Sequence, residues 1–390
     1  MSLNFRFAVL SDPHIALPHT IWDHPSRFHL VEISIPALEF IFERLDQLDL
    51  DFLLIPGDLT QHGEPANHQW LAQRLAQLPY PAYVIPGNHD IVQRDATEHS
   101  IGLADFPRYY EKFGYSDPTR PYYSCEVLPG LRLIGLNSNG FAADGQQLRS
   151  GYLDPEQLDW LQQVLAEAQD ELVFVMLHHN VLEHLPNQKQ SHLGQRYMLG
   201  NADQLLPLLE AAHVPVLFTG HLHVQDVAST QLGQSGHRLY EITTGSLVSY
   251  PHPYRVLECR QDEQGNCLLQ VESGRVTQVP DWDDLLHQSR EWMGDRSFPF
   301  MLKLLLQPPL SLPPVEAEAL APVLRYFWAD IADGDALFEF PHLPAPVQAF
   351  LAQFGAIDSL GQPQQIDNFA RLKLARQQLL SPSRAVRFVE

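Results

Sequence analysis

Cysteine is scarce in this sequence. Three of the 390 residues are cysteines, namely Cys125, Cys259 and Cys267. They are too few and too far apart along the chain for a disulfide framework or for a zinc site built from thiolates. We therefore interpret all three as ordinary thiols, and we expect any metal site to use other ligands.

Lysine and arginine are also few. The chain carries 25 of them against 47 Asp and Glu, which gives a formal net charge of −22. Proteins that bind nucleic acids place Lys and Arg against the phosphates, and a strongly negative chain is repelled by those phosphates. The composition therefore argues against a nucleic-acid polymer as partner.

Long hydrophobic runs are missing as well. The longest apolar runs, such as residues 172–177, are much shorter than the ~20 residues that cross a bilayer. Residues 1–10 lack the cationic start and the long apolar core of a signal peptide. We expect a cytoplasmic location and no membrane partner.

The chain does contain ample material for a folded core, because 45% of its residues are hydrophobic. At roughly 100 to 200 residues per domain, the length predicts two domains or one large domain with an appendage. Histidine is abundant, with 19 copies. Several of these histidines lie in tight polar clusters, which directs attention to metal or catalytic chemistry.

Short apolar runs alternate with segments of helical period in the first 220 residues. The runs predict buried strands over 5–10, 52–55, 82–85, 131–136, 172–177 and 214–219. The helical segments are 35–48, 65–78, 155–168 and 203–211. This alternation predicts βαβ units. Runs over 226–232, 237–243, 256–260 and 267–273, with Gly-containing turns between them, predict antiparallel strands that close the domain.

The character of the sequence changes after about Val279. Prolines at 299, 308, 309, 313 and 314 interrupt the chain, and apolar residues recur at helical spacing over 323–331 and 347–354. A last helix is predicted over 365–380. We therefore divide the chain into a domain of residues 1–279 and a helical region of residues 280–390. The helical region could add packing, cover a site as a lid, or form a homodimer contact.

Polar motifs rich in Asp, Asn and His follow five of the predicted strands. They are Asp12-Pro13-His14, Gly57-Asp58, Gly87-Asn88-His89-Asp90, His178-His179-Asn180 and Gly220-His221-Leu222-His223. Each motif alone is also typical of an ordinary turn. Ligand sites in open α/β sheets lie beyond the carboxyl ends of the strands, so we expect the motifs to converge on one rim.

These residue types together predict a metal site. Burying so many ionisable groups costs several kcal/mol each without compensation, and metal coordination supplies that compensation. Carboxylate, amide and imidazole donors without thiolate suit Mn²⁺, Fe or Zn²⁺. Seven or eight donors are too many for one ion. We therefore expect two metal ions, divalent or of mixed valence, that share a bridging carboxylate.

The order and spacing of these motifs resemble the calcineurin-like metallophosphoesterase superfamily over about residues 5–260. The complete series of motifs is specific to that superfamily. The resemblance implies an α/β (α+β) fold, in which two mixed β-sheets form a sandwich flanked by helices. In this chain the sandwich would be followed by the helical appendage.

The resemblance also implies the metal ligands. One ion would be held by Asp12, His14, Asp58 and His223. The second ion would be held by Asp58, Asn88, His178 and His221. Asp58 would thus bridge the two ions. His179 is the alternative to the adjacent His178, because spacing alone does not distinguish them.

The activity that the resemblance implies is phosphoester hydrolysis, in which a metal-bridged hydroxide attacks phosphorus. In the family, the residue corresponding to His89 lies beside the substrate. Our hypothesis is that His89 stabilises the oxyanion or protonates the leaving oxygen, and that Asp90 orients the His89 ring. A purely structural hydrogen bond is the alternative for His89.

Differences from neighbouring branches of the superfamily narrow the range of expected substrates. Gln61 stands where purple acid phosphatases have a tyrosine ligand, and the arginine with which Ser/Thr protein phosphatases grip a phosphomonoester is missing. Residues 57–63 and 154–168 look like the branch of class III cyclic nucleotide phosphodiesterases and glycerophosphodiesterases. We therefore expect a phosphodiesterase that acts on a small phosphodiester, with 3′,5′-cyclic nucleotides as the leading substrates.

Other functions remain open at this point. A glycerophosphodiesterase or another small-molecule phosphoesterase is the alternative enzyme, and a non-catalytic metal-binding scaffold is the alternative outside enzymes. Two loops are candidate substrate contacts: residues 14–29, which contain aromatic residues, and residues 187–197, which contain Lys189, His192 and Arg196. A plain connector is the alternative for each loop.

Overall fold

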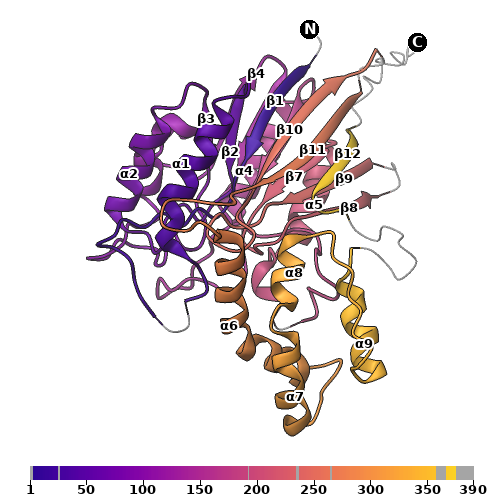
Figure 1. The fold of residues 1–390 in the computed structure, drawn as a ribbon. Helices are drawn as coiled ribbons and strands as arrows, with labels where there is room; N and C mark the ends of the chain where they lie inside the picture. The colour runs from indigo at the N-terminus through magenta and orange to yellow at the C-terminus, as the bar shows by residue number, and fades with distance from the viewer. Residues whose placement is uncertain are drawn as a thin grey trace, which may run out of the picture.

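The structure is a computed structural model, and it describes residues 3–24, 27–191, 193–233, 237–263, 266–356 and 366–374. Two six-stranded β-sheets form its centre, helices flank them, and a group of helices projects from one end (Figure 1). The predicted sandwich of two mixed sheets with flanking helices is thus confirmed. Of the predicted loop residues, His192 lies outside the described part.

The first sheet has the strand order β12-β11-β10-β1-β2-β3. Its strands are β1 (Asn4–Val9), β2 (Phe52–Ile55), β3 (Ala82–Val84), β10 (Pro253–Gln261), β11 (Cys267–Arg275) and β12 (Phe369–Leu374). β1, β2 and β3 run parallel, whereas β10 pairs with β1 in the antiparallel sense. The sheet is therefore mixed, and three of its parallel strands end on the same side.

The second sheet has the strand order β4-β5-β6-β7-β9-β8. Its strands are β4 (Tyr123–Leu128), β5 (Leu131–Gly135), β6 (Leu172–Met176), β7 (Val216–Thr219), β8 (Asp226–Leu232) and β9 (His237–Thr243). β5, β6, β7 and β9 run parallel, and β4 and β8 are antiparallel to their neighbours.

Aromatic side chains from both sheets form the core between them. Phe7 of β1 stacks on Phe52 of β2, with ring centroids 4.7 Å apart, and meets Phe218 of β7 edge-on at 5.6 Å. All three rings are buried. Burying such rings contributes roughly 1.5–3 kcal/mol each, and edge-to-face pairing adds to this. The contact fixes the two sheets face to face.

Helices cover the outer faces of the sandwich (Figure 1). Those that follow β1 and β2 lie beside the first sheet, and those that follow β5 and β6 are associated with the second. They are α1 (Ser34–Leu45), α2 (Pro65–Leu75), α4 (Pro155–Glu167) and α5 (Ala202–Ala211). Leu161 of α4 and Leu205 of α5 share a buried cluster with Val175 of β6. The predicted helices over 35–48, 65–78, 155–168 and 203–211 are confirmed, with ends that differ by up to three residues.

The helical region after residue 279 has a core of its own. Its helices are α6 (Leu285–Leu306), α7 (Pro314–Leu320), η4 (Ala321–Leu324), α8 (Phe327–Asp333), α9 (Ala345–Leu351) and η5 (Ala352–Phe354). We call these helices the helical cluster. Buried apolar side chains such as Leu305, Phe327 and Val347 hold it together, and the same core includes Leu222 and Val224. The helical cluster therefore packs against the loop that follows β7.

Three expectations about secondary structure were incomplete or wrong. The predicted helix over 365–380 is wrong in its described part, because residues 369–374 form β12, in which exposed and buried residues alternate with the period of a strand. Pro299 does not separate elements, since it lies inside the 22-residue helix α6. β4 was missed because as an edge strand it is partly exposed and has no continuous apolar run. The domain division at residue 279 stays a prediction.

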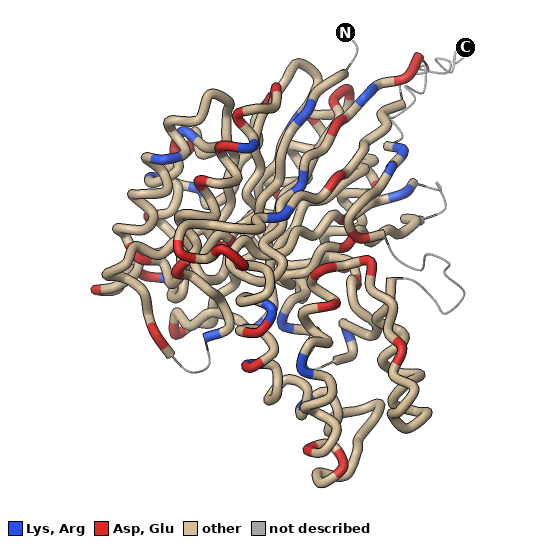
Figure 2. Tube along the Cα trace, viewed as in Figure 1, with Lys and Arg blue, Asp and Glu red and all other residues tan. Residues whose placement is uncertain are grey.

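Charged residues are distributed along both parts of the described chain. Lys and Arg lie singly or in small groups among Asp and Glu, without a long basic segment in the described trace (Figure 2). Among the described helices, none combines the length and the apolar character that a membrane span requires.

Candidate metal centre

The five polar motifs meet at one end of the sandwich. Three of them follow β1, β2 and β3 of the first sheet, and two follow β6 and β7 of the second. The predicted convergence is therefore found, but the rim is built from the strand ends of two sheets rather than one. Gly220 shows how close the sheets come, because a Cβ atom there would lie 2.2 Å from Ser11 Oγ.

Several of the predicted ligands have a backbone conformation that side-chain-bearing residues rarely adopt. The positive-φ residues among them are Asp12, His14, Asp58, His221 and His223. Left-handed backbone at a non-glycine residue costs of order 1–3 kcal/mol and clusters at functional sites. The fold therefore holds these side chains in strained turns, which aim them at a common point.

The motif glycines make room for the ligands. Gly57 has φ +97°, and a Cβ atom there would lie 2.5 Å from His178 Nδ1. A Cβ atom on Gly87 would lie 2.2 Å from the backbone nitrogen of Asp58. Any larger residue at either position would push a predicted ligand out of place, so these glycines are required by close approach.

The first group of donors contains the four residues predicted for one ion. The side-chain donor atoms of Asp12, His14, Asp58 and His223 all lie within 4.8 Å of one another. His223 Nε2 lies 3.1 Å from Asp12 Oδ1. His14 is fully buried, yet neither of its ring nitrogens has a hydrogen-bond partner among the described residues. A buried imidazole without a partner is costly unless a ligand satisfies it, which fits a metal ion.

The second group shares Asp58 with the first. Donor atoms of Asp58, His178 and His221 lie within 4.8 Å of one another. Asn88 joins them, because its Oδ1 atom lies 3.1 Å from His178 Nε2. Asp58 Oδ2 lies 3.3 Å from the same nitrogen. The geometry therefore puts Asp58 between the two groups, where a bridging carboxylate is expected.

Hydrogen bonds to backbone carbonyls set the tautomers of two histidines. His178 Nδ1 lies 2.8 Å from the carbonyl oxygen of Pro56, and His221 Nε2 lies 3.2 Å from that of Arg196. A carbonyl can only accept, so each of these nitrogens donates a proton, and in the neutral imidazole the other nitrogen keeps its lone pair. Metal-binding histidines are oriented in this way.

His179 lies close by but belongs to a different arrangement. Its Nδ1 atom lies 2.8 Å from Ser138 Oγ, and it is not among the residues whose donor atoms gather around Asp58. The preference for His178 over His179 as ligand therefore agrees with the geometry.

The charge state of the groups suits a cation. Burial alone would raise the pKa of Asp58, but His178 and His89 lower it well below its usual range. Burial lowers the pKa of His14 and of His221 well below the usual value, and neighbouring histidines add to the effect. The groups thus combine an ionised carboxylate with neutral imidazoles at His14 and His221. Burial alone would lower the pKa of His178, but Asp58 raises it to about 9. Carboxylate and imidazole are donors for Mn²⁺, Fe or Zn²⁺.

The same motifs decide the family of the chain. Residues 5–225, more than half of the sequence, match the calcineurin-like phosphoesterase family. The chain belongs to the calcineurin-like phosphoesterase family. This confirms the resemblance drawn from the motifs, and membership implies a centre of two divalent metal ions.

Curated relatives of the chain share modest identity with it. It is 33% identical to a probable cyclic nucleotide phosphodiesterase of Synechococcus sp. over 148 residues, which are 38% of this chain and 49% of the relative. It is 28% identical to the 3′,5′-cyclic adenosine monophosphate phosphodiesterase CpdA of Escherichia coli K12, over 54% of this chain and 66% of the relative. It is 26% identical to the glycerophosphodiester phosphodiesterase GpdQ of Enterobacter lignolyticus, over 63% of this chain and 80% of the relative. The chain thus spans about half the length of the first relative and about two thirds of the second.

Asp90 has a different role from the one expected. Among the described residues no hydrogen bond joins it to the ring of His89, whose Nδ1 atom faces the carbonyl oxygen of Gln61. The Asp90 carboxylate instead accepts hydrogen bonds from the backbone N–H groups of Leu59, Thr60 and Gly87 at 2.8–3.0 Å. Burial and the charge of Asp58 raise the pKa of Asp90 to about 7. The expectation that Asp90 orients His89 is therefore wrong. Asp90 instead joins the loops after β2 and β3.

Sequence reasoning missed two further groups at the centre. Glu241 of β9 is buried and accepts hydrogen bonds from the backbone N–H groups of Val181 and Leu182 and from Thr219 Oγ1, so it anchors the segment that carries His178. His29 lies with His14 and His223, and the donor atoms of these three also fall within 4.8 Å of one another. Neither residue belongs to a motif, and residue 29 entered the sequence analysis only as the end of the candidate substrate loop 14–29.

A cavity of about 830 Å³ opens at the metal-centre residues and extends to the helical cluster. Its polar end includes Asp58, Asn88, His89, His221 and His223. Its apolar end is lined by Phe300, Leu304, Trp328, Phe350 and Phe354. Arg149 and Arg196 also line it. The size is within the range of small-molecule sites, about 300–1,000 Å³, and the helical cluster supplies one wall.

Proposed function

We propose that this chain is a metal-dependent phosphodiesterase that hydrolyses a small phosphodiester, with 3′,5′-cyclic nucleotides as the leading substrates. The observation that carries the proposal is the cavity, which joins a polar end made of metal-donor residues to an aromatic wall. A phosphodiester group fits the polar end, and a nucleobase fits the aromatic wall because aromatic side chains stack on its faces.

We assign the metal ligands as the sequence predicts. Asp12, His14, Asp58 and His223 would hold one ion, and Asp58, Asn88, His178 and His221 the other. When bound, two such ions polarise phosphoryl oxygens and lower the pKa of water. The protein contributes the fixed donor positions and the cavity beside them.

His89 contacts the substrate in this proposal. Its Nδ1 atom lies 2.8 Å from the carbonyl oxygen of Gln61, so Nδ1 carries a proton and Nε2 is left for the substrate. His89 lines the cavity. In its protonated form it donates from Nε2 to a phosphoryl oxygen or to the leaving oxygen. Asp90 acts by fixing the loop that carries His89.

A glycerophosphodiester is the second candidate substrate. The relative named glycerophosphodiester phosphodiesterase is matched over 80% of its length, more than the cyclic nucleotide relatives described above. The aromatic wall favours a base over a glycerol group. The cytoplasmic location, the homodimer contact through residues 280–390 and the absence of nucleic-acid partners stay predictions from the sequence.

Hydrolysis assays on the Mn²⁺-reconstituted protein test the proposal. Cyclic AMP, bis(p-nitrophenyl) phosphate, its monoester and glycerophosphocholine are compared with and without chelator. We expect chelator-sensitive cleavage of both cyclic AMP and the synthetic diester in preference to the monoester. Diester cleavage without cyclic AMP turnover would move the substrate to another small diester. Metal binding without turnover of any phosphoester would favour a non-catalytic scaffold.

A further inference from the structure

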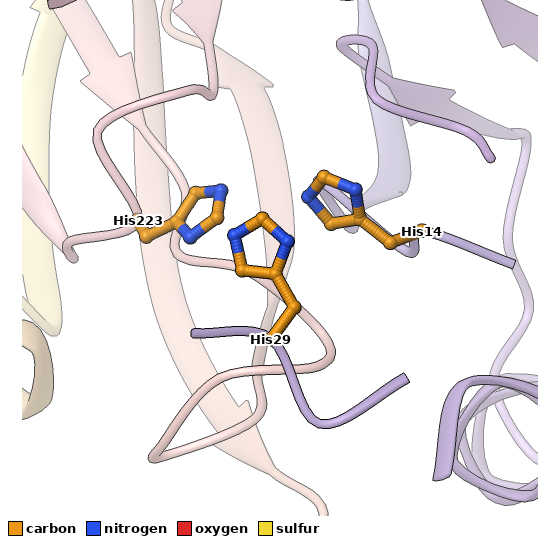
Figure 3. Close-up of side chains that lie close together, drawn as sticks. All are labelled: His14, His29 and His223. Atoms are coloured by element: carbon orange, nitrogen blue, oxygen red, sulfur yellow. The ribbon is translucent and has the colours of Figure 1, made fainter. Parts of the chain in front are cut away.

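A third histidine faces the first group of metal donors. The ring centroid of His29 lies 4.1 Å from that of His14 and 4.8 Å from that of His223. Figure 3 shows the three rings turned toward one another from three separate segments of the chain. His14 follows β1, His223 follows β7, and His29 lies just before the short helix η1 (Val31–Ile33). Three imidazoles that converge in this way form a nitrogen-rich pocket.

The backbone on both sides of His29 is fixed by hydrogen bonds. The N–H group of Leu30 donates to the carbonyl oxygen of Val248 at 2.8 Å. Trp292 Nε1 of α6 donates to the carbonyl oxygen of Phe28 at 3.1 Å. His29 is thus held from the sandwich on one side and from the helical cluster on the other.

Further contacts bind α6 to the same loop. Arg296 Nε donates to the carbonyl oxygen of Arg27 at 3.1 Å, and the rings of Phe28 and Phe300 meet edge-on at 5.4 Å. A positioned side chain needs support of this kind, because a flexible loop would lose conformational entropy each time it became ordered on binding a ligand. The helical cluster therefore determines where the imidazole of His29 lies.

The chemistry of His29 fits a metal ligand. Its donor atoms lie within 4.8 Å of those of His14 and His223, and a neutral imidazole offers a lone pair to a metal ion. The same donor type serves Mn²⁺, Fe and Zn²⁺.

We propose that His29 is a further protein ligand at the first metal site, where its donor atoms group with those of His14 and His223 but not with those of Asp12 and Asp58, and that α6 positions it. This inference rests on the proposed two-ion site. It assigns a role to the helical cluster, because α6 would then complete the metal site as well as line the cavity. It also makes the first ion richer in nitrogen ligands than the family motifs alone provide.

Metal binding to variants tests this inference without use of the activity. His221→Ala serves as background, because it removes a ligand of the second ion and leaves the first site for study. Mn²⁺ affinity is measured by calorimetry, and couplings to imidazole nitrogen by electron spin echo spectroscopy. In this background, His29→Ala is expected to weaken Mn²⁺ binding at least about tenfold and to remove one coupled imidazole. Trp292→Phe, which loses the donor to Phe28, should weaken binding in the same direction but less.

His19→Ala is the matched control, because His19 is an exposed histidine of the same loop. It should leave affinity and nitrogen couplings unchanged. Thermal unfolding monitored by circular dichroism shows whether each variant folds. A folded His29→Ala protein with unchanged Mn²⁺ affinity and unchanged nitrogen couplings would overturn the inference, while diester hydrolysis by the wild type would still support the proposed function. A wild type that binds no metal would instead remove the proposed function itself.

Discussion

The Nδ1 atom of His89 lies 2.8 Å from the backbone carbonyl oxygen of Gln61. This contact joins the loop after β3 to the loop after β2, and it determines which nitrogen of His89 faces the cavity. It also replaces the carboxylate that the sequence led us to expect behind this ring.

Replacing His89 with alanine should slow diester hydrolysis without emptying the metal site. Loss of a positioned proton donor typically costs 10²–10⁴-fold in rate, and His89 is not among the grouped donor residues. The test is kcat with bis(p-nitrophenyl) phosphate, together with metal content by mass spectrometry. Unchanged kcat and an unchanged pH profile would leave His89 with a structural role alone.

Asp58→Ala should reduce bound metal at both sites, because Asp58 belongs to both groups of donors. We expect less than one ion per chain after dialysis against Mn²⁺, and no measurable diester hydrolysis. Asn88→Ala is the comparison, and it should impair mainly the second site. Two ions retained per chain in Asp58→Ala would refute the bridging assignment.

Glu241→Gln should destabilise the fold. The amide would put an NH₂ group against the N–H donors of Val181 and Leu182, and it would remove the charge opposite His184. Breaking a buried pair of this kind costs about 3–5 kcal/mol, which urea unfolding measures. Glu272→Gln, an exposed strand position, is the control and should change the unfolding free energy by less than about 0.5 kcal/mol.

Arg255→Met should also destabilise the protein. The guanidinium is fully buried and donates to the carbonyl oxygens of Thr243 at 2.9 Å and Asp367 at 2.8 Å. Methionine fills much of the volume but leaves both carbonyl groups without that donor, at a cost of about 1–3 kcal/mol each. Arg260→Met, at an exposed side chain of the same strand, should be nearly neutral in the same unfolding experiment. Equal effects at both positions would argue against the assigned role.

His184 should make stability depend on pH in the alkaline range. Burial alone would lower its pKa, but Glu241 and Asp226 raise it to about 10. Because the folded pKa lies above the unfolded value of about 6.5, this stabilisation is fully present below pH 6.5. It is lost as pH rises toward 10, at up to about 1.4 kcal/mol per pH unit. Urea unfolding of metal-free protein from pH 6 to pH 10 should show a steeper decline for the wild type than for His184→Gln. Parallel curves would contradict the prediction.

The positions of the five motifs could be predicted because each follows an apolar run, and the end of a parallel strand has a known place in a sheet. The pairing of strands could not, because β1 and β7 read alike as buried strands although they belong to different sheets. The role of His29 was equally hidden. The residue that fixes its neighbour Phe28 is Trp292, which is 264 positions away in sequence.

Predictions from local sequence were wrong where tertiary packing determines the structure. Pro299 is typical of a helix break, yet α6 continues through it, because buried residues before and after it, such as Leu285 and Leu305, pack into hydrophobic clusters. Asp90 follows His89 directly and reads as its partner. In the fold, three backbone N–H groups donate hydrogen bonds to its carboxylate instead.

The pairing of β12 with β11 has a mechanical consequence. β11 precedes the helical cluster in the chain and β12 follows it, and the two strands are antiparallel neighbours. The cluster is therefore connected to the first sheet at both of its ends. Two connections to one sheet restrict the rotation of the cluster more than a single linker would. Because Trp292 and Arg296 donate to the carbonyl oxygens of Phe28 and Arg27, any outward displacement of the cluster would widen the cavity and release the His29 loop together.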